Sequence, residues 1–162
     1  MNSSNKQIKR NKLTNHQLLE LSKKIKKEGM RLGFQQIGIT DTNLSEDEKC
    51  LEQWLSLGRN GEMEYMSRHG KKRSRPKMLV PETIKIISAR MDYWPSESRK
   101  PNDILSNKNK AYISRYALGR DYHKVLKKRL SALARFIKKS VGHYGFRVFV
   151  DSAPVLEKAI AR

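Results

Sequence analysis

The sequence contains only one cysteine, Cys50, among its 162 residues. A single cysteine excludes an intramolecular disulfide, and it also excludes an iron–sulfur cluster or a cysteine-type zinc site built from this chain alone. The histidines lack metal-ligand spacing such as His-Glu-x-x-His. The phosphate-binding pattern Gly-x-x-x-x-Gly-Lys and the dinucleotide-binding pattern Gly-x-Gly-x-x-Gly are absent as well. We therefore expect no metal ligands and no nucleotide-binding loop in this chain.

Long apolar runs are also absent. No apolar stretch approaches the 18 residues typical of a membrane-spanning helix. Residues 1–12 are polar and basic and lack the apolar segment of a secretion signal. These two absences predict a cytoplasmic protein that does not contact a membrane.

Acidic residues are scarce compared with basic ones. The chain has 16 Asp and Glu against 35 Lys and Arg, a formal net charge of +19, and only 37% hydrophobic residues. The mean hydropathy of −0.76 is correspondingly low. A charge of this size is most easily tolerated beside a polyanion, so nucleic acid is the first partner to expect. The plainer alternative is a solvated basic surface.

Turn signals and apolar spacing divide the chain into short elements. Residues 1–13 are typical of a disordered basic arm, and a domain is expected from residue 14 to residue 162. Capping-box pairs, Thr14 with Gln17 and Ser45 with Glu48, each predict the start of a helix. The pattern predicts further elements: strands at 35–40 and 83–91, a polar loop at 95–110 and a helix at 121–140. Alternating strands and helices indicate the α/β or α+β class.

The last segment has the pattern of a strand-to-helix turn. Residues 147–150 are β-branched and aromatic, and Asp151 follows them, so a strand should end where a capping side chain begins a helix. Pro154 suits the first turn of that helix. Residues 155–162 contain no helix-stop signal, so we expect a fragment of a longer domain.

Four groups of residues could support chemistry. Asp151 could exchange a proton at the end of a strand, although spacing alone favours a helix N-cap. Arg73 and its basic neighbours could clamp phosphates, or they could line a solvated loop. Ser114, in the run Ser-Arg-Tyr, suits an anionic or planar ligand, but the signal is weak. One face of the 121–140 helix could contact RNA or simply face solvent: Lys124, Lys128, Arg135 and Lys139.

Several segments together resemble the N-terminal half of epoxyqueuosine reductases. They are Leu-Gly-Phe at 32–34, Gly-Glu-Met-Glu-Tyr-Met at 61–66, Lys-Arg-x-x-Pro-Lys-x-Leu-x-Pro at 72–81, Tyr-Ile-Ser-Arg-Tyr-Ala-Leu-Gly-Arg-Asp-Tyr-His-Lys at 112–124 and Phe-Val-Asp-Ser-Ala-Pro-Val-Leu-Glu at 149–157. The resemblance extends in order over about residues 18–162. The last two segments are the longest and most specific.

The resemblance implies a cobalamin-dependent enzyme that reduces epoxyqueuosine to queuosine at the wobble position of the tRNAs for Asp, Asn, His and Tyr. It implies a cobalamin-binding domain similar to that of reductive dehalogenases, followed by a ferredoxin-like domain with two 4Fe–4S clusters. By the same resemblance, Asp151 is the proton donor to the epoxide oxygen and also lies against the cofactor. Arg73 and Ser114 match cobalamin-contacting positions.

The chain departs from that family in one large respect. The family's cluster-binding run C-x₂-C-x₂-C-x₃-C-P is absent, because Cys50 is the only cysteine. We therefore expect no turnover from this polypeptide alone, and a separate chain with the iron–sulfur half could complement it. The alternative is a non-catalytic basic RNA-binding module or a degenerate remnant.

Overall fold

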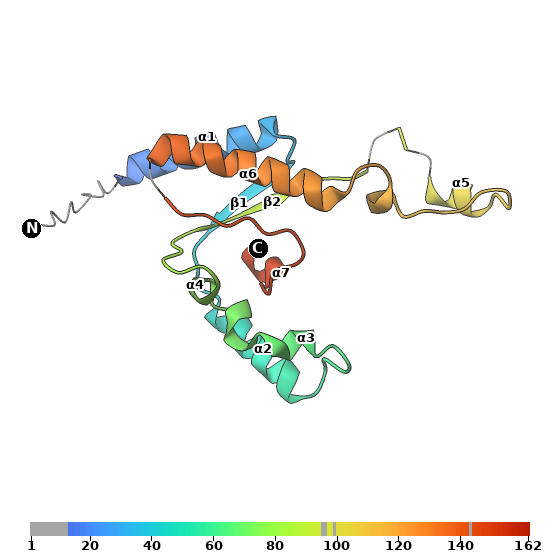
Figure 1. Ribbon diagram of the computed structural model, residues 1–162, viewed down its shortest axis with the longest axis horizontal. Helices are drawn as coiled ribbons and strands as arrows, with labels where there is room; N and C mark the ends of the chain where they lie inside the picture. Colours follow the sequence, from blue (N-terminus) through green and yellow to red (C-terminus); the bar gives the residue numbers. More distant parts are fainter. Residues whose placement is uncertain (1–12, 95–96, 99, 143) are drawn as a thin grey trace, which may run out of the picture.

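The computed structural model describes residues 13–94, 97–98, 100–142 and 144–162. All but the last residue of the predicted basic arm, 1–13, therefore lie outside the described residues. The main body consists of two long helices and two strands (Figure 1). They are helix α1 (Asn15–Arg31), strand β1 (Gln36–Thr40), strand β2 (Ile86–Arg90) and helix α6 (Tyr122–Val141).

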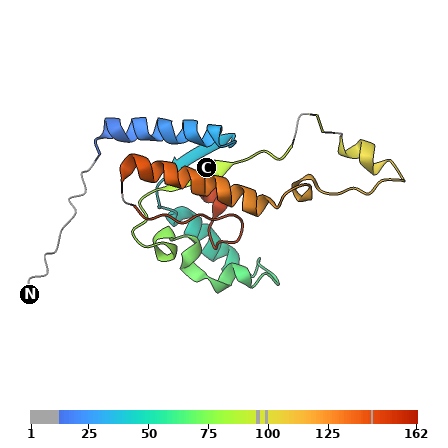
Figure 2. The same cartoon turned by 45° about the horizontal axis from the view of Figure 1, so that its top comes forward.

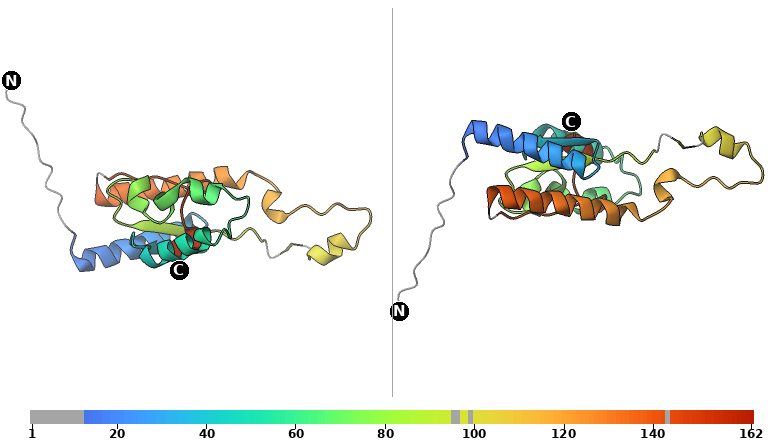
Figure 3. Two further views of the ribbon diagram at one scale, coloured as in Figure 1. Left: turned by 90° about the horizontal axis from the view of Figure 1, so that it is seen from below. Right: turned by 90° about the horizontal axis from the view of Figure 1, so that it is seen from above.

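Helices α1 and α6 lie side by side over the two-stranded sheet (Figure 3). The strands pair antiparallel, with Ile37 opposite Ala89 and Ile39 opposite Ile87, so these four side chains share one face of the sheet. That face packs against the helices in a core built on five buried residues: Ile25, Phe34, Ile37, Leu133 and Ile137. The core therefore holds both long helices on one side of the sheet.

Short helices form a second group beyond the sheet (Figure 2). This group contains α2 (Ser45–Ser56), α3 (Tyr65–Arg68), η1 (Gly70–Arg73), α4 (Pro76–Leu79) and α7 (Glu157–Ile160). A long excursion with α5 (Pro101–Leu105) leaves the body after β2, and η2 (Arg115–Ala117) leads it back to the start of α6 (Figure 1). None of the helices in the described residues is long and apolar enough to cross a membrane.

The mixture of helices and strands agrees with the expected class, and both long helices begin where the sequence predicts. The Thr14–Gln17 capping box is complete at α1, and the Asp121 side chain caps α6 by accepting a hydrogen bond from the backbone N–H of His123 at 2.9 Å. Helix α2 also begins where predicted, at Ser45, but the second capping box does not form. Leu44 occupies the N-cap without a side-chain bond, the N–H of Ser45 donates to the Asn43 side chain, and Glu48 binds Arg75.

The end of the chain also differs from the prediction. Residues 147–150 are not a strand, because among the described residues only β1 and β2 pair into a sheet. The expected helix over 155–162 is shortened to the single turn of α7. Asp151 is therefore not the cap of a helix: five residues separate it from the first residue of α7. Cys50 lies exposed on α2.

Candidate functional site around Asp151

Asp151 occupies a tight turn in the left-handed region of backbone conformation, with φ of 55°. Few non-glycine residues adopt this conformation, but Asp and Asn tolerate it better than most because their short polar side chains bond locally. The carboxylate remains about half exposed, at 53%. The turn thus presents an acidic side chain to solvent rather than burying it.

Two side chains from the first turn of α6 contact the Asp151 carboxylate. The Tyr122 hydroxyl donates a hydrogen bond to Oδ2, and Nε2 of His123 lies 3.5 Å from the same oxygen. Because Asp121 caps α6, Tyr122 and His123 are the first two residues of that helix and are well placed to meet the 151 turn. Residues 29 positions apart are thereby joined, which no local pattern indicates.

Aromatic packing fixes the orientation of the Tyr122 ring. The His123 ring stacks on it with centroids 4.0 Å apart, and the Tyr116 ring meets it edge-on at 5.9 Å. Nδ1 of His123 lies 3.1 Å from the Asp121 carboxylate. We call these five residues the Asp151 cluster: Tyr116, Asp121, Tyr122, His123 and Asp151.

The electrostatics of the cluster favour a protonated phenol beside a carboxylate. The hydrogen bond to Asp151 raises the pKa of Tyr122 to about 12, with smaller contributions from burial and from the nearby Asp151 charge. Burial, and then the Asp151 charge, also raises the pKa of Glu157 above its ordinary value. The site therefore combines an exposed carboxylate with a phenol that stays protonated at neutral pH, an arrangement suited to proton transfer.

Arg73, expected to face a ligand, is instead buried and binds the protein's own backbone. Its side chain is only 8% exposed. Its guanidinium donates to the backbone carbonyls of Tyr65 at 2.5 Å and Met66 at 3.1 Å. Its own carbonyl accepts from the N–H of Leu156 at 3.3 Å, so the backbone at Arg73 lies beside the segment that follows Asp151.

Ser114 and the basic face of α6 are both open to solvent. Ser114 is exposed at the start of η2, two residues before Tyr116, so it belongs to the segment that contacts the Asp151 cluster. The four basic residues of α6 are exposed, and none forms an ion pair with another described residue: Lys124, Lys128, Arg135 and Lys139. No group of three or more potential metal ligands is found in the described residues.

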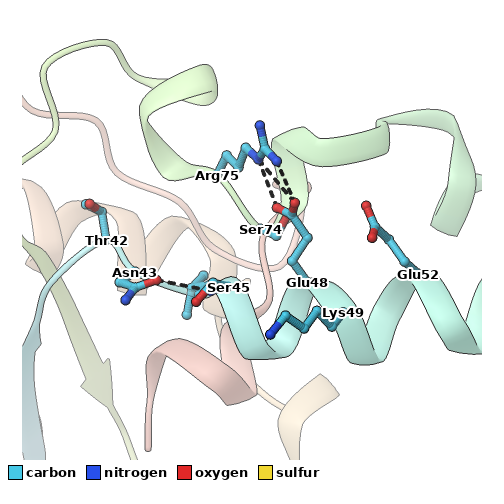
Figure 4. A pocket seen from close by; sticks show the side chains of 9 residues that line it. Thr42, Asn43, Ser45, Glu48, Lys49, Glu52, Ser74 and Arg75 are labelled. Atoms are coloured by element: carbon cyan, nitrogen blue, oxygen red, sulfur yellow. Dashed lines mark hydrogen bonds and ion pairs between the residues drawn. The ribbon is translucent and has the colours of Figure 1, made fainter.

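A second polar centre was missed by the sequence analysis. Glu48 receives two parallel hydrogen bonds from Arg75, at 2.7 and 3.0 Å, and a third from the Ser74 hydroxyl at 2.5 Å. These residues line a pocket between α2 and the segment that precedes α4 (Figure 4). The Arg75 guanidinium, the Ser74 hydroxyl and nearby Lys71 lower the pKa of Glu48 to about 2. Because Glu48 and Arg75 are 27 positions apart in the sequence, no spacing rule reveals the pair.

Comparison with known proteins shows which proteins this chain resembles. The family model described as "Epoxyqueuosine reductase QueG, DUF1730" matches residues 73–152. The epoxyqueuosine reductase of Pseudomonas aeruginosa is 58% identical over 141 residues, covering 87% of this chain and 39% of that protein. The epoxyqueuosine reductase of Escherichia coli is 50% identical over 144 residues, which cover 89% of this chain and 38% of that protein. The chain thus spans about two-fifths of the length of the curated relatives it matches.

Two solved structures share the fold. A selenomethionine-labelled epoxyqueuosine reductase matches with a TM-score of 0.69 at 23% identity, covering 89% of this chain and 38% of that one. The epoxyqueuosine reductase from Streptococcus thermophilus matches with a TM-score of 0.65 at 26% identity, and the match covers 86% of this chain and 37% of that one. The chain is therefore similar in sequence and in fold to the N-terminal part of epoxyqueuosine reductases.

Proposed function

We propose that residues 14–162 form the cobalamin-binding part of an epoxyqueuosine reductase, with a fold similar to the corresponding domain of reductive dehalogenases. The reaction converts the epoxide of epoxyqueuosine in tRNA into the alkene of queuosine. It consumes two electrons and two protons, breaks both epoxide C–O bonds and releases the oxygen as water. The observation that supports this function best is the solvent-facing Asp151 carboxylate held by the first turn of α6.

Asp151 is the proton donor in this proposal. Opening an epoxide develops negative charge on its oxygen, and an acid placed beside that oxygen neutralises the charge as it forms. The half-exposed carboxylate can exchange its proton with solvent between turnovers. Because about half of the Asp151 side chain is exposed, a substrate can also approach it from solvent.

The residues near Asp151 suit a large ligand with polar and apolar faces. The Ser114 hydroxyl and the Asp151 carboxylate are exposed, and large apolar side chains of the same excursion are also open: Ile113 at 56%, Tyr116 at 56% and Leu118 at 52%. Ser114 and Asp151 would contact cobalamin through hydrogen bonds. Arg73 fits less well, because its guanidinium already binds two backbone carbonyls.

Bound cobalamin supplies the low-potential reducing chemistry, with electrons delivered from two 4Fe–4S clusters. This chain has one cysteine and cannot hold those clusters, so they belong to a further segment or a separate chain. We place the reaction in the cytoplasm, on the tRNAs for Asp, Asn, His and Tyr. The exposed basic residues of α6 are the surface we assign to RNA contact: Lys124, Lys128, Arg135 and Lys139.

The test has a binding part and a reaction part. The purified chain should bind cobalamin in equilibrium dialysis, and it should form no queuosine on tRNA with cobalamin and a reductant alone. Adding the cluster-bearing polypeptide in trans should restore conversion. Asp151→Asn should then reduce the rate about 100-fold or more, because a general acid contributes roughly that factor, and leave cobalamin and tRNA affinity within about 2-fold.

Asp103→Asn is the matched control, since Asp103 is another exposed aspartate, on α5 and outside the Asp151 cluster. It should leave the rate unchanged. Full activity of Asp151→Asn would show that Asp151 is not the acid. Salt-dependent tRNA binding without cobalamin binding or conversion in any mixture would favour a non-catalytic RNA-binding module instead.

A further inference from the structure

Both side chains that contact the Asp151 carboxylate contact the same oxygen. The Tyr122 hydroxyl donates a hydrogen bond to Oδ2, and Nε2 of His123 lies 3.5 Å from the same oxygen. The other oxygen, Oδ1, accepts no hydrogen bond from any residue in the described part of the chain. The carboxylate is thus held from one side and open on the other.

The holding groups are themselves fixed before any substrate arrives. The Tyr122 ring is stacked on His123 at 4.0 Å and contacted edge-on by Tyr116, so its hydroxyl has little freedom to turn. The His123 ring is fixed at its other nitrogen by Asp121, the residue that caps α6. A chain of contacts therefore connects the helix cap to Oδ2, and supporting contacts of this kind are what hold a reactive group in a productive geometry.

We propose that Tyr122 and His123 are positioning residues that hold Oδ2 of Asp151, so that Oδ1 is the oxygen that carries the proton to the epoxide. This inference rests on the proposed function of Asp151 and adds the residues that orient it. In the step, the Oδ1–H bond breaks, one epoxide C–O bond breaks and an O–H bond forms on the former epoxide oxygen. The two electrons of the overall reduction come from the low-potential reductant, and Asp151 recovers its proton from water.

Tyr122 is not itself the proton source in this arrangement. With a pKa of about 12, its phenol is a weaker acid than an unperturbed tyrosine, and it would have to give up its bond to Oδ2 to reach a substrate. Its value to the reaction lies in geometry, since a misplacement of about 1 Å at a reacting group can cost roughly 100-fold in rate.

The first test measures the Tyr122–Asp151 bond directly and needs no turnover. With ¹³Cζ-labelled tyrosine and Tyr122→Phe to assign the signal, Tyr122 in the 162-residue chain should titrate near pH 12. Asp151→Asn should return it toward pH 10, because the negative charge that stabilises the phenol is removed. The groups facing the phenol are Asp151, Asp121, Tyr116 and His123, and only the first is changed. A wild-type Tyr122 that titrates near pH 10 would overturn the inference whether or not the protein is a reductase.

The second test uses the reconstituted reaction. Tyr122→Phe keeps the ring and its packing but removes the hydroxyl, so kcat should fall about 10- to 100-fold while KM and cobalamin affinity change less than about 3-fold. In an Asp151→Asn background, Tyr122→Phe should have no additional effect, because the oxygen it positions no longer carries the proton. Tyr93→Phe, at an exposed tyrosine outside the Asp151 cluster, is the control and should change neither kcat nor KM.

The two tests separate two kinds of failure. A normal kcat for Tyr122→Phe, with Asp151→Asn still inactive, refutes the positioning role but leaves the proposed function intact. A Tyr122 that titrates near pH 12 in a protein for which no mixture shows conversion refutes the proposed function, and the positioning role fails with it.

Discussion

The carboxylate of Glu48 joins helix α2 to the segment that begins α4, 27 residues further along the chain. Arg75 binds it through two parallel hydrogen bonds and Ser74, only 3% exposed, adds a third. Paired bonds of this kind are among the stronger polar contacts in proteins. Glu48 is therefore the residue whose charge most clearly stabilises the packing of the short helices.

Stability should depend on the Glu48 charge in acid. The folded-state pKa of about 2 lies below the ordinary value of 4.5, so the charge stabilises the fold above pH 4.5 and loses this effect as the pH falls from about 4.5 to 2. Glu48→Gln should therefore lower the urea midpoint at pH 7 but not at pH 2. Glu46→Gln removes an exposed pair with Lys49 and should change the midpoint little at either pH. Equal destabilisation at both pH values for Glu48→Gln would contradict the assignment.

At the scale of elements, α1 approaches β1 through a glycine. A methyl group added at Gly29 would lie 2.4 Å from Cγ1 and 2.7 Å from Cδ1 of Ile37, which is only 7% exposed. These separations are far shorter than van der Waals contact, so the helix can rest on the strand only while position 29 has no side chain. The close approach at Gly29 fixes the spacing between α1 and the sheet.

Gly29→Ala should destabilise the protein by about 1–3 kcal/mol, because a buried core tolerates extra volume poorly. The direction is informative, since glycine to alanine in an unobstructed helix stabilises by up to about 1 kcal/mol. Urea unfolding measures the sum of the steric cost at position 29 and the gain in helix propensity. Gly145→Ala, where the added methyl group meets nothing within 4 Å, is the control. A Gly29→Ala protein as stable as the wild type would show that α1 lies farther from β1.

For the molecule as a whole, the net charge of +19 favours a polyanionic partner. A polyanion that neutralises exposed lysines and arginines releases its counterions, so binding weakens steeply as salt rises. The α6 face offers four basic side chains without ion pairs among the described residues, on the helix that also begins at the Asp151 cluster. Both the proposed substrate and the charge therefore point to RNA.

Replacing Lys124, Lys128, Arg135 and Lys139 together by Gln should weaken tRNA binding. It should also reduce the slope of log K against log salt by about 0.7–0.9 for each phosphate that the protein no longer neutralises. The control replaces three exposed lysines of α1, Lys24, Lys26 and Lys27, and tests for a general charge effect. Filter binding over a series of salt concentrations measures both the tRNA affinity and its salt dependence for each variant. Equally weakened binding in the two variants would mean that net charge, rather than the α6 face, determines binding.

Short-range sequence patterns predict where the long helices begin, but they predict the surroundings of Glu48 and Asp151 poorly. The Thr14–Gln17 capping box and the Asp121 cap are short-range hydrogen bonds, so residue spacing alone is enough to find them. Ser45 and Glu48 have the same spacing, yet the Arg75 guanidinium outcompetes the helix terminus for the carboxylate. The sequence pattern predicts Asp151 at the end of a strand, whereas its segment pairs with no strand among the described residues.

The positions of α1 and α6, the basic character of the chain and, through its motifs, the resemblance to epoxyqueuosine reductases can all be predicted from the sequence alone. Each depends on composition or on neighbours a few residues apart. Three interactions become visible in the folded molecule alone: Arg73 binds backbone carbonyls, Glu48 pairs with Arg75, and Tyr122 and His123 both contact one oxygen of Asp151. Those interactions join residues 8, 27 and 29 positions apart, or lie between elements whose approach is set by core packing. No local periodicity encodes such distances, because they follow from how the elements pack.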